Sequence, residues 1–279
     1  MTLSRTCAIW TAAFLLVSCR ERSQFAFGPT EYEWPDSFSY LVEVVAESRA
    51  ETLVVARYEE RKAIRFAARD GRFLVWYDSV TKLSLVPGQA PVLQPYDPED
   101  TLQYYVGLGR RGEVTDAEPG CDPLVGGCGE VLPSILPMEL RRMVPRLPEW
   151  EPPRGFAWED TLVFDDTRRA RGQRGSVVTT YRVVGDTVVA SSGLWVVAWR
   201  SLRRAYSPAS GPTGLAPNVP VEERGTVYVD KGRRIPVFAM WAGGAAAPEN
   251  LRSAGVTSAG YRGRAYLAGS VVEQVLSPE

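Results

Sequence analysis

The sequence predicts a mainly β protein: an antiparallel curved half-barrel or a two-layer β-sandwich with one short amphipathic helix. Apolar and polar residues alternate with a period of two through most of the chain after residue 37, which is typical of half-buried strands. A single stretch, residues 132–147, has helical spacing instead. The chain is 45% hydrophobic and 23% charged with a formal charge of −1. This composition argues against both disorder and nucleic-acid binding.

Residues 1–18 are expected to be a signal peptide. An apolar run at 8–17 follows Arg5, and it is too short for a transmembrane helix, which needs about 20 apolar residues. The run ends in Leu16-Val17-Ser18-Cys19. These four residues resemble the lipobox of bacterial lipoproteins. The resemblance implies that Cys19 is acylated, becomes the first residue of the mature chain and is its contact with the membrane.

The same resemblance predicts a location. Lipoproteins belong to the bacterial cell envelope, and in the enterobacterial rule a residue other than aspartate after the cysteine directs them to the outer membrane, facing the periplasm. Arg20 follows Cys19 here. Residues 19–36 are therefore expected to be a lipid anchor and tether. The alternative is an ordinary signal peptide with a chance cysteine at its end.

Residues 37–279 are expected to form a single β-rich domain with two halves, 37–117 and 155–276. In the first half, Phe38, Tyr40 and Val42 share one parity while Ser39 and Glu43 take the other. Asp70-Gly71 is a strong hairpin signal, and residues 109–112 turn a second hairpin. The predicted strands of this half are 38–47, 52–58, 62–68, 73–80, 101–108 and 113–117.

A helix is expected at 132–147. Its apolar residues Leu136, Leu140, Met143, Val144 and Leu147 recur at the spacing of one helical face, while Glu139, Arg141 and Arg142 fall off that face. Pro137 fits the first turn, and prolines 145 and 148 end the helix. This helix and the loop 118–130 join the two halves.

The second half returns to strand patterns. Turns are expected at Gly185-Asp186 and Lys231-Gly232. The predicted strands are 155–165, 176–184, 187–190, 194–202, 225–230, 235–241 and 260–276. A sheet of about ten or more strands must curl or split into two layers, which is the basis of the half-barrel or sandwich prediction.

Two cysteines remain for the folded domain, Cys121 and Cys128. An exported chain meets an oxidising compartment, and the short loop between them contains Pro and Gly, so a disulfide is the favoured interpretation. A zinc site needs four ligands and the chain has no histidine. No metal and no cofactor are therefore expected.

Some strands are apolar on both faces. In 194–200, Trp195 and Trp199 share one face while Leu194 and Val196 share the other, and Trp76 lies in a similar strand. Both faces of such strands must be covered. Either ordinary core packing buries both faces, or one face lines a hydrophobic cavity under the helix. The candidate ligand-binding residues are Trp76, Trp195, Trp199, Leu136, Leu140 and Met143.

The sequence offers little for catalysis. The absence of histidine removes the commonest general base and every histidine-dependent nucleophile. Residues 107–112 match Gly-x-Gly-x-x-Gly, but no helix can follow because Pro119 comes too soon, so a hairpin turn is the better interpretation. We therefore expect the protein not to be an enzyme.

The layout of lipid anchor, β-meander, helix and second meander is similar to uncharacterised bacterial lipoproteins and, remotely, to the lipoprotein-carrier half-barrels that hold acyl chains. The resemblance implies a lipid-anchored, non-enzymatic envelope protein that binds a hydrophobic ligand or a lipidated partner beneath the helix. The alternative is a structural or interaction module of an envelope protein complex, docking through a sheet edge or arginine-rich loops.

The anchor can be tested directly. Substitution Cys19→Ala should abolish acylation and membrane fractionation. The resemblance to bacterial lipoproteins implies that the Cys19 thiol is the group that is acylated. Labelling with a radioactive fatty acid and membrane fractionation measure the two effects. Cys7→Ala, in the segment expected to be removed, should change neither. Unchanged fractionation of the Cys19→Ala protein would count against the lipobox interpretation.

Overall fold

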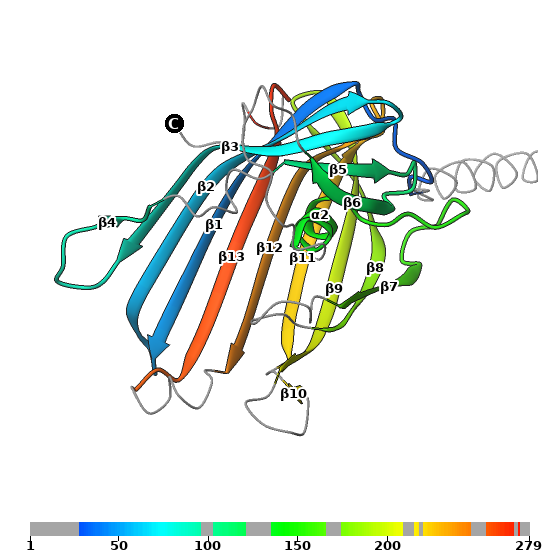
Figure 1. The fold of residues 1–279 in the computed structure, drawn as a ribbon. Coiled ribbons are helices and arrows are strands. Elements are labelled where there is room, and N and C mark those ends of the chain that lie inside the picture. The colour runs from blue at the N-terminus through cyan, green and yellow to red at the C-terminus, as the bar shows by residue number, and fades with distance from the viewer. Residues whose placement is uncertain are drawn as a thin grey trace, which may run out of the picture.

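A single antiparallel sheet of thirteen strands dominates the computed structural model of the chain (Figure 1). The structure describes residues 28–95, 103–120, 135–165, 174–208, 215–217, 220–246, 255–270 and 273. The mainly β prediction is confirmed. The elements are β1 Ser37–Ala50, β2 Leu53–Arg69, β3 Arg72–Leu85, β4 Val92–Leu93, β5 Gln103–Leu108, β6 Val114–Gly120, α2 Ile135–Met143, β7 Ala157–Asp165, β8 Arg174–Val189, β9 Ser192–Pro208, β10 Leu215–Pro217, β11 Val221–Asp230, β12 Pro236–Ala246 and β13 Ser258–Leu267.

The first and last strands meet at the centre of the sheet. The order is β6-β5-β3-β2-β1-β13-β12-β11-β9-β8-β7, with β4 beside β3 and β10 beside β9. Strands β1 and β13 pair from Tyr40 opposite Leu267 to Arg49 opposite Ser258. The two halves that flank the helix in sequence therefore belong to one sheet.

The sheet curves around α2. The helix contacts β11 and β12 in one half of the sheet and β6 at the far edge of the other half. A flat sheet could not bring these strands to one helix, so the strand order itself requires curvature. Figure 1 shows β5 and β6 folded across the end of the long strands, with α2 between the two parts. We call the face that carries α2 the concave face.

The predicted helix is present, but it ends earlier than predicted. In the described residues it covers Ile135–Met143 and ends at 143 rather than 147, because Pro145 disfavours helical backbone at Val144. Leu140 and Met143 are each only 1% exposed. They join strand residues of the concave face in the main core, which includes Tyr40, Val42, Ile64, Phe66, Val75, Tyr104, Val106, Tyr181, Val197, Val227, Ala239 and Ala265.

Residues 28–36, assigned to the tether from the sequence, belong to the folded domain. The Tyr32 amide donates to the carbonyl of Arg110 (2.5 Å), and its hydroxyl donates to the carbonyl of Pro145 (2.8 Å). The Gly28 amide donates to the carbonyl of Pro152 (2.8 Å). Tyr32 is fully buried, and burial raises the pKa of its hydroxyl. The segment thus ties the 109–112 hairpin to the chain that follows α2.

Two predicted boundaries between strands are wrong. Residues 52–58 and 62–68 form one strand, β2, because the charged residues between them find cross-strand partners: Arg61 pairs with Glu43 (3.5 Å). Gly185-Asp186 is not a turn but an irregularity inside β8, where the register to β9 shifts. The turn follows at Ala190 and Ser191, which both have positive φ. Strand β13 also ends at Leu267 rather than 276.

The hairpins at 70–71 and 109–112 are confirmed. Gly112 in the second hairpin has φ +82°, and a Cβ there would lie 2.7 Å from the carbonyl oxygen of Pro145. Gly71 in the first has φ +78° with open space around it. The two glycines therefore share a backbone conformation and differ in their surroundings.

Substitution Gly112→Ala should lower the free energy of unfolding by about 3 kcal/mol, since left-handed backbone and overpacking both destabilise an alanine there. Gly71→Ala is the matched control and should lower it by about 1 kcal/mol, from backbone conformation alone. Urea unfolding measures both. Equal losses would show that the contact with the segment after α2 is unimportant.

Candidate functional site

The concave face is built in rows that run across the strands. One row passes from β7 to β13 through residues that face each other in register: Trp158, Tyr181, Trp199, Gly225, Trp241 and Gly263. Trp158 stacks on Tyr181, with ring centres 5.5 Å apart. Six strands thus contribute an aromatic or a glycine to one row beside α2.

Each glycine in this part of the face lies under an aromatic ring from the next strand. A Cβ on Gly225 would lie 2.6 Å from the Trp199 ring, and one on Gly263 would lie 2.3 Å from the Trp241 ring. In the next row, a Cβ on Gly243 would lie 2.7 Å from the Tyr261 side chain. The glycines let the rings lie flat on the sheet, which makes an aromatic floor under the helix.

The next row is polar. It contains Asp160, Thr179, Ser201, Glu223, Gly243 and Tyr261 in register. Thr179 and Ser201 are 2% and 4% exposed. Polar side chains at buried positions of a sheet need partners, and those of the carboxylates come from α2.

Glu139 of α2 is bound by strands β2 and β3. The Lys62 ammonium donates to its Oε1 (2.6 Å), and the Tyr77 hydroxyl donates to its Oε2 (2.7 Å). Burial lowers the pKa of Lys62, but Glu139 and Glu60 outweigh burial and raise it overall. Burial, followed by the negative charge of Glu139, raises the pKa of Tyr77. Lys62 is therefore a protonated ion-pair partner rather than the free amine that a nucleophile requires.

Arg142 of α2 is bound by β11. Its Nε and Nη2 donate to the two carboxylate oxygens of Glu223 at 3.2 and 2.5 Å, a bidentate arrangement. The Tyr261 hydroxyl of β13 also donates to Glu223, and the guanidinium lies 5.5 Å from the Tyr261 ring centre. This contact holds the C-terminal turn of the helix over strand β11.

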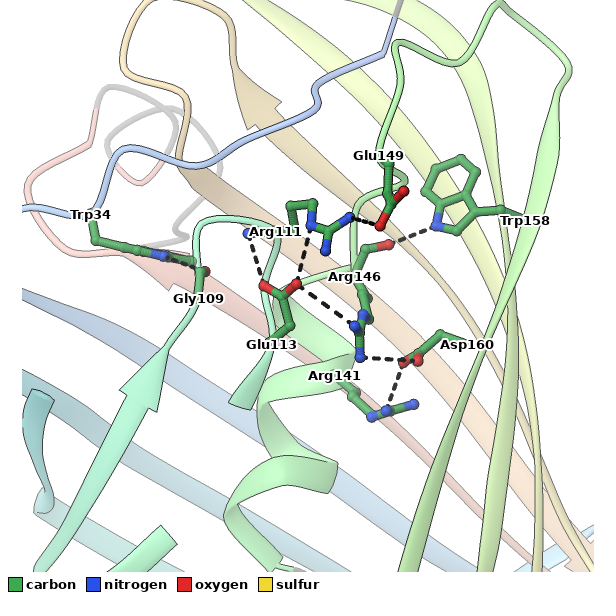
Figure 2. A network of polar contacts seen from close by, with 9 residues as sticks. All are labelled: Trp34, Gly109, Arg111, Glu113, Arg141, Arg146, Glu149, Trp158 and Asp160. Carbon is green, nitrogen blue, oxygen red and sulfur yellow. Dashed lines mark hydrogen bonds and ion pairs between the residues drawn. The ribbon is translucent and has the colours of Figure 1, made fainter. Parts of the chain in front are cut away.

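Arg141 of α2 is bound by the edge strand β7. Its Nη2 lies 2.6 Å from Oδ2 of Asp160, and Nη1 of Arg146 lies 3.6 Å from Oδ1 (Figure 2). Asp160 is 10% exposed. Arg146 also lies 3.7 Å from Glu113, which holds Arg111 of the 109–112 hairpin at 3.2 Å. The network therefore joins β7, α2 and the hairpin.

A small cavity lies between α2 and strands β8, β9 and β11. Its volume is about 20 Å³, room for one water-sized group. Its lining is Met138, Arg141, Arg142, Val177, Thr179, Trp199, Ser201, Arg203 and Glu223. Val177 also belongs to a second apolar cluster with Phe164 and Ala205, against which Met138 and Leu162 pack. A pocket with both polar and apolar lining and a buried apolar patch therefore adjoin beside the helix.

The structure brings some of the predicted ligand-binding residues together and separates others. Trp199 lines the cavity, and Leu140 and Met143 lie in the core beneath α2. Trp195, near the beginning of β9, is partly buried, and the Lys231 ammonium lies over its ring. It is not part of the cavity lining. Trp76 alternates with the core residues Val75 and Tyr77, so it points to the opposite face. The proposed trio of tryptophans therefore does not share one cavity.

Several predictions fall outside the described residues. These are the signal peptide, the lipidation site Cys19 and the disulfide pair Cys121 and Cys128. Leu136 lies in α2, but its side chain is outside the description. No helix in the described ranges is long and apolar enough to cross a membrane. Within the same ranges, no three acidic or cysteine side chains group closely enough to hold a metal ion.

The sequence analysis missed the polar partners of the helix. Asp160 shares strand parity with Trp158 and Leu162, and Glu223 shares it with Val227. A charged residue on the otherwise apolar face of a strand is the signal that could have identified them, since such a residue needs a partner of opposite charge. The opposite charges are those of α2, where Arg141 pairs with Asp160 and Arg142 pairs with Glu223.

No protein-family model matches the chain, and no curated protein matches it either.

The contact between β7 and α2 can be tested by Asp160→Asn. Removing one charge of a buried pair should lower the free energy of unfolding by about 3 kcal/mol, because Arg141 is left without its counter-charge. Glu222→Gln is the control: it breaks the Arg200–Glu222 pair, whose side chains are 71% and 52% exposed, and should cost less than about 1 kcal/mol. Denaturant unfolding measures both, and equal effects would contradict a structural role for Asp160.

Proposed function

We propose that this protein is a non-catalytic, lipid-anchored protein of the bacterial cell envelope that binds an elongated apolar ligand, such as an acyl chain of a lipid or lipidated partner. The ligand would lie on the concave face between α2 and strands β8, β9 and β11. The observation that carries the proposal is a pocket of mixed polar and apolar lining that adjoins an apolar patch, beside a helix held to the sheet by ion pairs.

The helix must move for such a ligand to enter. A ligand pocket commonly has a volume of about 300 Å³ or more, whereas the cavity beside α2 has about 20 Å³. Three charged side chains of α2 bind strands β2, β11 and β7. Ion pairs that break can be replaced by hydration of the separated charges, so the helix can act as a lid.

The anchor would set the orientation of the domain. Cys19 and Gly28 are nine residues apart, so an extended chain between them reaches at most about 30 Å. Residues 28–36 dock against the 109–112 hairpin and the chain after α2. The end of the half-barrel that carries the helix would therefore lie nearest the membrane, where lipids are available.

One observation favours a second candidate, an interaction module of an envelope complex. Strand β7 is the last strand of the sheet, and Val163 on it is 74% exposed. An edge strand can accept a further strand from a partner. Affinity capture from membranes that yields a stoichiometric protein partner, with no lipid bound to the isolated protein, would favour this candidate over the first.

Two neighbouring threonines of β8 provide a matched test of the ligand site. Thr179 lines the cavity on the concave face, while Thr180 is exposed on the opposite face. Displacement of a fluorescent apolar probe by a fatty acid should be weakened about 10-fold in Thr179→Leu, because the larger side chain fills the cavity. Thr180→Leu should bind as the unmodified protein does.

Thermal unfolding of both variants verifies that they are folded. Native mass spectrometry of the purified unmodified protein should also show retained lipid that exchanges with added fatty acid. Absence of both retained and exchangeable lipid would contradict the proposal, as would equal weakening in the two threonine variants.

A further inference from the structure

The cavity beside α2 contains two buried hydrogen-bond donors that lack an acceptor among the described residues. One is Nη1 of Arg141 and the other is the indole Nε1 of Trp199, which is 5% exposed. Both side chains line the cavity. An indole and a guanidinium have donors only, so neither can satisfy the other, and a buried donor without an acceptor is unfavourable.

The rest of the lining adds donors and positive charge. Thr179 and Ser201 contribute buried hydroxyls, and Arg142 and Arg203 contribute two more guanidinium groups. The carboxylate of Glu223 is part of the lining, but it is engaged by Arg142 and by the Tyr261 hydroxyl. Asp160 lies outside the lining and forms an ion pair with the other terminal nitrogen of Arg141, Nη2, although its Oδ2 accepts no hydrogen bond among the described residues. The lining atoms used here that lack a hydrogen-bond partner among the described residues, Nη1 of Arg141 and Nε1 of Trp199, are therefore both donors.

We infer that this pocket recognises the anionic head group of the ligand, a carboxylate or a phosphate, through Arg141 Nη1 and Trp199 Nε1, with Ser201 and Thr179 beside them. The inference rests on the proposed function, and it specifies the ligand as an amphipathic anion rather than a neutral apolar molecule. The volume of about 20 Å³ suits an oxygen-sized group and not an acyl chain.

The apolar patch lies where the chain of such a ligand would begin. Val177 lines the pocket and belongs to the cluster with Phe164 and Ala205, and Met138 of α2 borders both. A head group in the pocket would thus have apolar side chains directly beside it. Donors followed by apolar side chains suit a ligand in which an anionic head group is followed by an alkyl chain, as in an ionised fatty acid or a single-chain phosphate.

Trp199→Phe removes the indole N–H and keeps an aromatic ring over Gly225. Trp241→Phe is the matched control. Trp241 also has a buried indole N–H that finds no acceptor in the described part of the chain, and it lies in the same row, on β12 and outside the cavity lining. Displacement of a fluorescent apolar probe from the full chain at pH 8 would compare dodecanoate, dodecyl phosphate and the neutral dodecanol.

The unmodified protein should bind a dodecyl anion about 10-fold more tightly than dodecanol, as a charge-assisted hydrogen bond allows. Trp199→Phe should lose most of this preference while binding dodecanol normally, and Trp241→Phe should keep it. Whichever anion binds more tightly identifies the source: dodecanoate a free fatty acid, dodecyl phosphate a phospholipid.

Equal binding of the anions and dodecanol would overturn the head-group inference and leave the proposed function intact. Loss of the preference in Trp241→Phe but not in Trp199→Phe would overturn the assignment of the pocket. Failure of all three compounds to displace the probe would overturn the proposed function, and the head-group inference with it.

Discussion

The structure depends on one electrostatic constraint, the neutralisation of three charged side chains on a nine-residue helix that lies inside a sheet. Glu139, Arg141 and Arg142 are within one helical turn of each other, yet their partners come from strands β2, β7 and β11. These strands are far apart in the sheet order. Only a curved sheet can present all of them to one short helix. Curvature and helix placement are therefore mutually dependent.

Small residues on the concave face let the helix approach the sheet. Where Trp199 and Trp241 cross onto the neighbouring strands, glycine occupies the facing position, so each ring lies flat against backbone instead of standing upright. A side chain at Gly225 would raise the Trp199 ring toward α2 and widen the separation between helix and sheet. The short ion-pair distances, such as 2.6 Å from Arg141 to Asp160, need that close approach.

Local signals predicted much of the fold but little of the site. Asp70-Gly71 forms the expected hairpin, and apolar spacing identified α2, because both depend on neighbouring residues. The turn expected at Gly185 failed because glycine also permits a bulge within a continuous strand, and only pairing with β9 distinguishes the two. Similarly, Asp160 as the partner of Arg141 depends on topology, since β7 approaches α2 through the curvature of the whole sheet.

The way α2 is held limits which ligands could displace it. When the helix leaves the sheet, water can solvate Arg142 and Glu223 individually, so the loss of their interaction is largely offset by hydration. Nothing in water offsets exposure of Leu140 and Met143, which are buried in the core. A ligand that opens the site must therefore replace apolar contacts rather than ion pairs. An acyl chain supplies such contacts and a purely polar ligand does not, which is why the charged contacts of α2 are compatible with an apolar cargo.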